Sequence, residues 1–425
     1  MKFINNFKDS KKYINEFLRT SEIDESIYKV CNEIRLNIQN NGDSSLKEYA
    51  LKFDNCKRDF ELDDNSIDNS FSNVSQEFIG SINKSINRSK EFHRNSMPKS
   101  WKNKNNSLGE NIIPVDRALC YVPGGTAPLV STVIMTVVPA KIAGVKEVII
   151  TSPAVNDVVS DEIVVAAKLA GADRIFLLGG AQSIFAFANG TDLVPRVDLI
   201  CGPGNKYVTE AKRQVFGSVG IDGLYGPTET LVISDKSNDI ELCAADLIAQ
   251  AEHDVEATPI LITDSLEFSK KVESEIYNQI KSLPRKEIIK KSFQYKGLFF
   301  IVENILDSIE LANLISAEHV SILSDEIIDN HEKIVNAGGV FLGDDSAEVF
   351  GDYIAGPSHV MPTGGSARFN SALNVRHFLK YQPVINLSKE EVLTIIDDVI
   401  NLAELEKLDG HAQSAAIRKK KMIGE

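Results

Sequence analysis

A glutamine and a histidine stand three residues apart in a stretch whose sequence favours an α-helix. Residues 244–254 read AADLIAQAEHD with apolar residues at helical spacing, so Gln250 and His253 are predicted to share one helix face. An amide oxygen and an imidazole nitrogen on one face could bind a divalent metal ion. A solvated helix end would contain the same two residues, so the pair by itself leaves both interpretations open.

Further imidazole and carboxylate groups follow in later stretches of the chain. They are Glu318 and His319, Glu348 and Asp352, His359, and His411 in the sequence LDGH. Such groups could complete the mixed nitrogen and oxygen shell that zinc accepts, although wide spacing does not show that they meet. Glu318 and His319 are adjacent at an expected strand start. Their side chains should point to opposite sides and form no simple ion pair unless the backbone is irregular.

Two series of short apolar segments must position these groups. The first series is 148–150, 175–177 and 198–200, with a helical pattern at 163–169. The second series is 231–233, 260–262, 299–301, 320–322 and 340–342, with helical patterns near 240–252, 266–281 and 306–315. Strand, helix and strand at this spacing predict parallel βαβ units. We therefore expect an α/β protein with two Rossmann-like, doubly wound domains.

The flanking segments are predicted to be mostly helical. Helical patterns lie near 24–40, 74–94 and 390–406. We predict an N-terminal arm at 1–22, a first α/β domain from 23–109 with 229–370, a second from 110–228, and a small helical C-terminal extension at 371–425. The extension has too little apolar sequence to form a core alone, so it must dock on another surface.

Composition excludes several classes of function. The chain has 425 residues, and 43% of them are hydrophobic, as in a globular protein. Its net charge of −14 argues against nucleic acid as a partner, because phosphates would repel such a surface. Five cysteines without a C-x-x-C pair indicate a reducing compartment, and the sequence has neither a signal-peptide pattern nor a membrane-spanning run. We expect a cytoplasmic protein that acts on a small molecule and binds no membrane.

Three glycine turns follow predicted strands. They are PGG at 123–125, GG at 179–180 and GPG at 202–204. Such turns let backbone N–H groups approach an anion such as a nucleotide phosphate. No G-x-G-x-x-G fingerprint accompanies them, so the turns alone are a weak signal for a dinucleotide site.

Several rare strings together carry a resemblance to the histidinol dehydrogenase family. They are QAEHD (250–254), AEH (317–319), GDYIAGPSHVMPTGGSARF (351–369) and EKLDGH (406–411), in this order. The match continues through YVPGG (121–125), GGAQ (179–182), GPGN (202–205) and TEAKRQV (209–215). It covers roughly residues 110–418, and it is specific because none of the strings is of low complexity.

The resemblance implies an NAD-dependent oxidation of L-histidinol to L-histidine through histidinaldehyde, with zinc positioning the substrate. It implies that His319 takes the proton from the substrate and that Glu318 activates water. The implied NAD contacts, all within 110–228, are Tyr121, Gln182 and Asn205. The implied zinc ligands are Gln250, His253, Asp352 and His411. The implied substrate contacts are these four ligands together with Thr228, His319, Glu348, His359 and Glu406.

The resemblance also implies an assembly. In the family the C-terminal piece crosses to the partner subunit, so we expect a homodimer with shared active sites in which His411 serves the neighbouring chain. The remaining histidines and the single tryptophan match no functional position. His331 and His377 are expected to be surface or structural residues, and His93 and Trp101 to belong to helical packing or the surface.

Two departures from the family pattern leave alternatives open. Tyr225 and Thr228 stand where the family usually has alanine and serine, and GHAQS (410–414) departs from A-H-x-x-A. A paralogous zinc- and NAD-dependent dehydrogenase of another polar alcohol would differ in its activity with histidinol. A zinc hydrolase could use the same metal, glutamate and histidine, but the glycine turns would then lack a purpose, and NAD binding would discriminate. A catalytically silent binding protein is disfavoured because no matched position is lost.

Overall fold

The computed structural model describes residues 1–18, 24–124 and 128–424, which form two compact units. Residues 19–22 of the predicted arm and Gly125 of the first glycine turn lie outside the described residues. The larger unit comprises Met1–Met97 and Val115–Phe378, and the smaller unit comprises Pro98–Pro114 and Leu379–Glu425.

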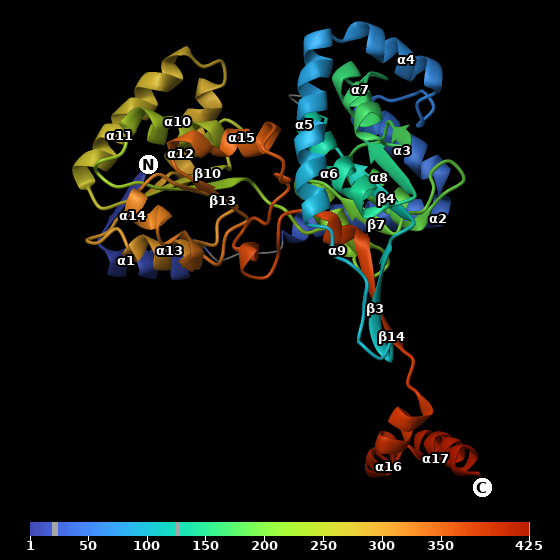
Figure 1. Cartoon of the computed structure of the whole chain (residues 1–425). Coiled ribbons are helices and arrows are strands. Elements are labelled where there is room, and N and C mark those ends of the chain that lie inside the picture. Colours follow the sequence, from blue (N-terminus) through green and yellow to red (C-terminus); the bar gives the residue numbers. More distant parts are fainter. Residues whose placement is uncertain (19–23, 125–127, 425) are drawn as a thin grey trace. The chain divides into compact units, whose positions relative to one another are not determined.

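One parallel sheet of the larger unit has five strands. Their spatial order is β6 (Arg174–Phe176), β5 (Glu147–Thr151), β4 (Arg117–Tyr121), β7 (Leu199–Cys201) and β8 (Gly220–Ile221). The chain runs from β4 outward to β6 and then returns to β7 on the other side of β4. Right-handed crossovers therefore place α6 (Val130–Ala143) and α7 (Asp161–Ala170) on one face, and α8 (Gly180–Asn189) and α9 (Lys206–Val215) on the other (Figure 1). The predicted strands at 148–150, 175–177 and 198–200 are confirmed, and this sheet is doubly wound.

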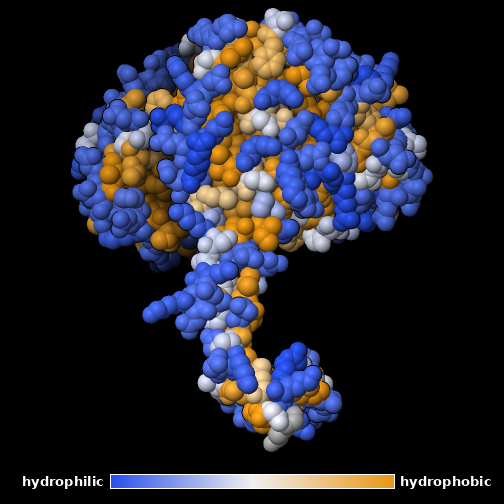
Figure 2. All heavy atoms as spheres, turned by 45° about the vertical axis from the view of Figure 1, so that its right-hand side comes forward, coloured by the Kyte–Doolittle hydropathy of each residue, from blue (hydrophilic) through white to orange (hydrophobic). Residues whose placement is uncertain are grey.

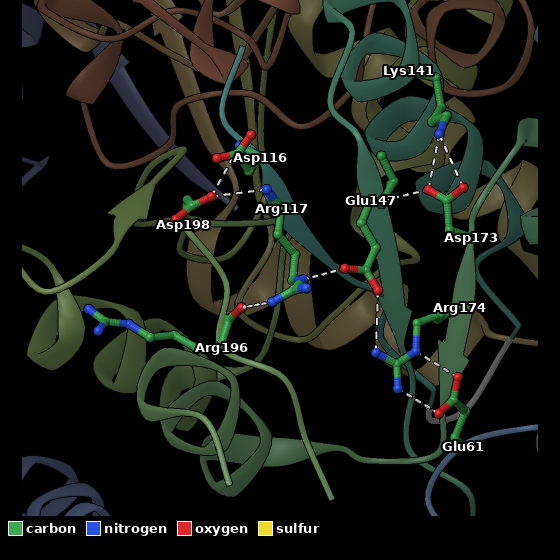
Figure 3. A network of polar contacts seen from close by, with 10 residues as sticks. Glu61, Asp116, Arg117, Lys141, Glu147, Asp173, Arg174, Arg196 and Asp198 are labelled. Atoms are coloured by element: carbon green, nitrogen blue, oxygen red, sulfur yellow. Dashed lines mark hydrogen bonds and ion pairs between the residues drawn. The ribbon is translucent and has the colours of Figure 1, made fainter. Parts of the chain in front are cut away.

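Ion pairs join the amino ends of these strands (Figure 3). Arg174 pairs with Glu61 at 2.6 Å and with Glu147 at 3.3 Å, and Glu147 also pairs with Arg117. These side chains are partly exposed, so each pair contributes little stability by itself. Together they tie neighbouring strands at one edge of the sheet, while the glycine turns lie at the opposite, carboxyl edge.

The other parallel sheet of the larger unit has six strands. Their order is β1 (Lys2–Asn5), β11 (Leu298–Ile301), β10 (Thr258–Thr263), β9 (Glu229–Ile233), β12 (His319–Ile322) and β13 (Gly339–Leu342). The helices are α1 (Phe7–Tyr13), α10 (Ile240–Ala251), α11 (Leu266–Gln279), α12 (Lys286–Lys296), α13 (Asp307–Ile315), α14 (Asp325–Ile328) and α15 (Glu348–Tyr353). Leu231 and Ile233 join the buried cluster on one face and Val232 joins that on the other, which is why β9 is apolar throughout. The five predicted strands are confirmed, and β1 adds an unpredicted edge strand from the N-terminal arm.

The N-terminal helices pack on the helices of the five-stranded sheet. They are α2 (Glu25–Asn41), α3 (Asp43–Asp54), α4 (Asp64–Asn73) and α5 (Gln76–Asn95). Helix α2 contacts α8 and α9, α4 contacts α7, and α5 contacts α6. The sequence grouped 23–109 with 229–370, whereas these contacts join the helices to the sheet of the intervening segment. An amphipathic pattern shows that a helix buries one face but not which partner covers it.

The smaller unit is a three-stranded antiparallel sheet followed by two helices. The strands β14 (Leu379–Ile385), β3 (Leu108–Pro114) and β2 (Trp101–Lys102) pair in this order, and α16 (Lys389–Leu405) packs on α17 (Asp409–Ile423). Helix α16 begins with a capping box made by Ser388 and Glu391. The predicted helix at 390–406 is confirmed, whereas the strands were not predicted. Figure 2 shows apolar side chains on the surface of the two helices. None of the helices that the structure describes has the length and apolar character to span a membrane.

Candidate active site

Glu318 and His319 lie at the amino edge of the six-stranded sheet, where β12 begins. His319 is the first residue of β12, and its neighbours in the sheet are Thr230 of β9 and Gly339 of β13. The ring of Phe341 stacks on the imidazole at 5.9 Å between centroids. Glu318 precedes the strand, so its side chain need not point to the opposite face of the sheet from that of His319.

The Glu318 carboxylate therefore reaches the neighbouring imidazole. Its Oε2 lies 3.7 Å from His319 Nδ1, and both residues are buried. The expectation that these adjacent side chains could not pair was wrong. The position of Glu318 and His319 at the amino edge is also unusual, because open α/β sheets more often bind ligands at the carboxyl ends of their strands.

The Thr228 hydroxyl links Glu318 to the predicted metal ligands. Its Oγ1 lies 2.7 Å from Glu318 Oε2 and 2.9 Å from Gln250 Oε1. Gln250 Nε2 donates a hydrogen bond to Asp352 Oδ2 at 3.1 Å. The backbone N–H of Glu229 also donates to Glu318 Oε2, at 3.3 Å. Residues from four separate parts of the chain thus form one hydrogen-bonded cluster.

Asp352 connects this cluster to His359. Asp352 Oδ1 lies 3.6 Å from His319 Nε2, and the Asp352 carbonyl accepts a hydrogen bond from His359 Nδ1 at 2.9 Å. That bond fixes the tautomer of His359 and leaves Nε2 facing Thr132 Oγ1 at 3.4 Å. Helix α6 of the five-stranded sheet therefore reaches the cluster through its first turn.

The cluster contains several buried carboxylates around one central imidazole. Burial raises the pKa of both Glu229 and Glu348 to about 8, and burial also raises the pKa of Glu318 against the opposing effect of His319. Burial would lower the pKa of an imidazole, but the surrounding carboxylates, Glu318 first, raise that of His319 to about 10. Burial would raise the pKa of Asp352, but the neighbouring His319 lowers it. The site thus favours bound positive charge.

Gln250 and His253 do not share a helix face in the predicted way. Helix α10 ends at Ala251, and the His253 N–H closes a tighter turn on the Gln250 carbonyl at 3.1 Å. Gln250 is buried with 2% of its surface exposed, so the solvated interpretation does not hold for it. His253 is exposed in the turn after the helix. In residues 1–18, 24–124 and 128–424, no group of three or more His, Cys, Asp and Glu side chains is arranged to hold a metal ion.

The last two predicted site residues belong to the smaller unit. Glu406 caps the carboxyl end of α16, and His411 lies in the first turn of α17. Both side chains are exposed.

The predicted cofactor residues line the carboxyl edge of the five-stranded sheet. Tyr121 ends β4, and its hydroxyl accepts a hydrogen bond from the Gly180 N–H at 3.2 Å. Gln182 is in the first turn of α8 and is 1% exposed, and its Nε2 has no partner among the described residues. Asn205 is exposed and caps α9, accepting from the N–H groups of two following residues at 3.0 and 3.2 Å. This edge lies where the strand order reverses between β4 and β7, the usual ligand crevice of a doubly wound sheet.

The unassigned residues take structural positions. His331 Nδ1 lies 2.8 Å from the Ile328 carbonyl, and His377 Nδ1 accepts from the Asn374 N–H at 3.2 Å. Burial lowers the pKa of His93 to about 4, and Trp101 is exposed on β2.

Three residues of the cluster were missed from the sequence. Glu229 directly follows Thr228 and could have been found from it. Thr132 and Phe341 carry no local signal, because only the tertiary fold brings them to the site.

Comparisons with a family model, with related sequences and with a solved structure all point to the same family. The family model for histidinol dehydrogenase matches residues 18–419. Histidinol dehydrogenase of Carboxydothermus hydrogenoformans is 41% identical over 416 residues, which are 96% of this chain and 98% of that protein. The enzyme of that name from Thermus thermophilus is 49% identical over 312 residues, covering 73% of this chain and 75% of that protein. The crystal structure of histidinol dehydrogenase from Elizabethkingia anophelis superimposes with a TM-score of 0.93 at 30% identity, covering 99% of this chain and 98% of that chain. The chain therefore belongs to the histidinol dehydrogenase family of oxidoreductases.

Proposed function

We propose that this protein oxidises L-histidinol to L-histidine through histidinaldehyde and reduces two NAD in the process. The observation that carries the proposal is the buried pair of Glu318 and His319 beside Asp352, because it offers two bases at one point. The names of the relatives favour histidinol over another polar alcohol, so Tyr225 and Thr228 are taken as variation within the family.

The two bases suit the two half-reactions. In the first, the alcohol loses a proton from oxygen and a hydride from carbon to give the aldehyde. His319 Nε2 has no hydrogen-bond partner among the described residues and is assigned to take the alcohol proton. In the second, water adds to the aldehyde and the hydrate loses a further hydride. Glu318, whose pKa is raised by burial, is assigned to take the proton from water.

The residues of the five-stranded sheet fit a bound NAD. Among the residues that the structure describes, none is a hydrogen-bond partner of the buried amide nitrogen of Gln182. Gly202 lets the turn approach β4 so closely that a Cβ there would lie 2.2 Å from the Tyr121 carbonyl oxygen. Tyr121, Gln182 and Asn205 would hold the cofactor beside this turn. When bound, NAD would supply the hydride acceptor, which no protein side chain can provide.

The hydrogen bonds of Thr228 support a cation between Gln250 and Asp352. One hydroxyl proton cannot serve Glu318 and the Gln250 oxygen together, unless Glu318 itself carries a proton. Rotating the Gln250 amide by half a turn, which exchanges its nearly identical O and N atoms, lets the nitrogen donate to Thr228. The rotation replaces the hydrogen bond from Gln250 Nε2 to Asp352 with two facing oxygens, an arrangement that needs a positive charge between them.

We assign that charge to zinc held by Gln250, His253, Asp352 and a fourth ligand, His411. Amide, imidazole and carboxylate donors are within the range that zinc accepts. Bound zinc would supply a positive point that orients the amino and imidazole nitrogens of the substrate. Thr228, His319, Glu348, His359 and Glu406 are assigned to contact the substrate together with the zinc ligands.

We further propose a homodimer in which the C-terminal extension completes the site of a second copy. The helices α16 and α17 carry exposed apolar residues, among them Leu402 at 60% and Leu405 at 71% exposure. Such side chains favour a covered position, and a second chain is the partner proposed here. The free cysteines support a cytoplasmic location.

Product stoichiometry tests the function. Each histidinol is expected to yield two NADH and end as histidine, measured by absorbance and amino-acid analysis. In the Glu318→Gln variant we expect turnover of histidinaldehyde to fall by about 10²–10⁴-fold, because the amide cannot take a proton from water. The matched control is Glu310→Gln, at an exposed glutamate of α13, which should behave as wild type. One NADH with free aldehyde in the wild type would contradict the proposal.

Removal of the metal tests the zinc assignment. Dialysis against a chelator is expected to lower turnover on the order of 100-fold or more, because the substrate loses its orienting charge. Circular dichroism and NAD binding should change little, because the assigned NAD residues lie on the five-stranded sheet. Full activity in protein shown by elemental analysis to be metal-free would refute the assignment.

A further inference from the structure

A lysine is buried at the carboxyl edge of the five-stranded sheet, outside the cluster described above. Lys212 of α9 has 2% of its side chain exposed, and its Nζ donates to Asp222 Oδ1 at 2.5 Å and to the Gly202 carbonyl at 3.0 Å. The ammonium also lies 4.9 Å from the centre of the Tyr225 ring, which attracts a cation. Asp222 follows β8 directly, and its carboxylate is fully buried.

The ion pair fixes both backbone polar groups of one glycine. Asp222 Oδ2 accepts from the Gly202 N–H at 2.7 Å, while Lys212 binds the Gly202 carbonyl. Gly202 has a φ of 105°, which only glycine adopts readily. Gly202 begins the turn that leads to Asn205, so the pair holds the turn assigned above to NAD.

Asp222 also begins a segment that ends in the catalytic cluster. Residues 222–228 are bound at several points along their length. Thr209 Oγ1 donates to the Tyr225 carbonyl at 2.8 Å, and the Gly226 N–H donates to Thr363 Oγ1 at 2.6 Å. At the far end lies Thr228, whose hydroxyl is 2.7 Å from Glu318. The short 222–228 segment, held by these hydrogen bonds, therefore connects the glycine turn with the Glu318 carboxylate.

Stability alone does not account for this arrangement. Removing two charges from water is costly, and a buried ion pair often stabilises a protein no more than apolar side chains of the same volume would. The pair does what apolar side chains cannot, because it binds a backbone N–H and a backbone C=O of one residue at defined positions.

We propose that Lys212 and Asp222 are positioning residues for hydride transfer, which hold the 202–205 turn in register with the 222–228 segment and thus with Glu318. The inference rests on the proposed function, because it requires that this turn carries the nicotinamide cofactor. Hydride transfer needs the two carbon atoms about 3–3.5 Å apart, and a misplacement of about 1 Å costs on the order of 100-fold in rate. The Lys212–Asp222 pair controls this carbon–carbon distance by fixing the turn that holds the cofactor.

The test is the double variant Lys212→Met with Asp222→Asn, which removes both charges and leaves no unpaired buried charge. Relative to wild type, kcat/KM for NAD is expected to fall at least about tenfold. The primary isotope effect on kcat with histidinol deuterated at its carbinol carbon is expected to rise, because hydride transfer becomes slower than the other steps. The KM for histidinol should change less than twofold.

Two further variants make the result interpretable. Lys141→Met removes a lysine of α6 whose Nζ pairs with Asp173 at 3.0 Å (Figure 3). Because α6 packs on the same five-stranded sheet, this variant is a matched control, and it should leave kcat/KM for NAD and the isotope effect unchanged. Thr209→Val keeps the side-chain shape but loses the hydrogen bond to the Tyr225 carbonyl. It should therefore lower kcat/KM for NAD and raise the isotope effect, as expected for the double variant, even if the double variant does not fold. A merely structural role would lower the melting temperature without raising the isotope effect.

The outcomes separate the inference from the proposed function. If wild-type protein does not reduce NAD with histidinol, the proposed function fails. If wild-type protein turns over and Thr209→Val, together with the double variant where it folds, keeps wild-type kcat/KM for NAD and isotope effect, only the positioning role is overturned.

Discussion

Replacing His319 with asparagine is expected to lower kcat for histidinol oxidation by about 10²–10⁴-fold. The buried imidazole, which lies 3.6 Å from Asp352, is the proposed base, and asparagine cannot accept a proton near neutral pH. The carboxylates around His319 raise its pKa to about 10, and a cation bound at Asp352 would oppose this effect. Steady-state NADH formation with zinc-loaded protein measures the effect.

The matched control for this variant is His331→Asn. His331 is partly buried, and its Nδ1 lies 2.8 Å from a backbone carbonyl, as His319 Nδ1 lies 3.3 Å from the Glu229 carbonyl, but His331 is outside the cluster. The control should retain wild-type kcat, and NAD affinity measured by calorimetry should be unchanged in both variants. A His319→Asn protein that folds, binds zinc and keeps kcat within tenfold of wild type would remove His319 from its proposed role.

Mixing two inactive variants, His319→Ala and His411→Ala, is expected to restore activity. If the C-terminal extension is exchanged, each heterodimer has one site with an intact His319 from one chain and an intact His411 from the other. Random exchange of equal amounts makes half of the dimers mixed, so about a quarter of all sites should work. Activity is measured before and after exchange, and heterodimers are counted by native mass spectrometry.

The control for the exchange places both lesions in one chain. Mixing the double variant with wild-type protein should lower the activity of the wild-type chains, because each site of a heterodimer then has one lesion. If His411 instead serves its own chain, the wild-type chains keep full activity in this mixture. In that case the mixture of single variants stays inactive despite verified exchange, and the shared-site model is lost.

The position of the cluster has a physical consequence for the reaction. Glu318 and His319 stand at the amino edge of one sheet, whereas Tyr121 and Gln182 stand at the carboxyl edge of the other. The proposed reaction therefore needs two sheets with opposite edges turned to one substrate. The 222–228 segment, which leaves β8 of one sheet and enters β9 of the other, is a short covalent link between them.

The sequence by itself determined the elements and the chemical groups. Strands such as β9 and β10 are buried on both faces, so they appear as short apolar runs between glycine or polar turns and can be read without a structure. Helices α7, α10 and α11 are set by periodicity in the same local way. The rare strings around Gln250, Glu318 and Asp352 were sufficient to identify the family, because they depend on residue type and order alone.

Only the tertiary structure decided which groups meet. Periodicity could not show that α10 ends before His253. Nor could it show that Glu318 precedes β12 and that its carboxylate lies near the His319 imidazole. It also could not show that β1 extends the six-stranded sheet, that α2–α5 cover α6–α9, or that β3 pairs with β14. No local pattern shows that Lys212 and Asp222 are buried together around Gly202. The strand pairings, the helix contacts and the Lys212–Asp222 pair each join residues that are distant in the sequence, and a local pattern records the need to bury or pair a group but not the partner that satisfies it.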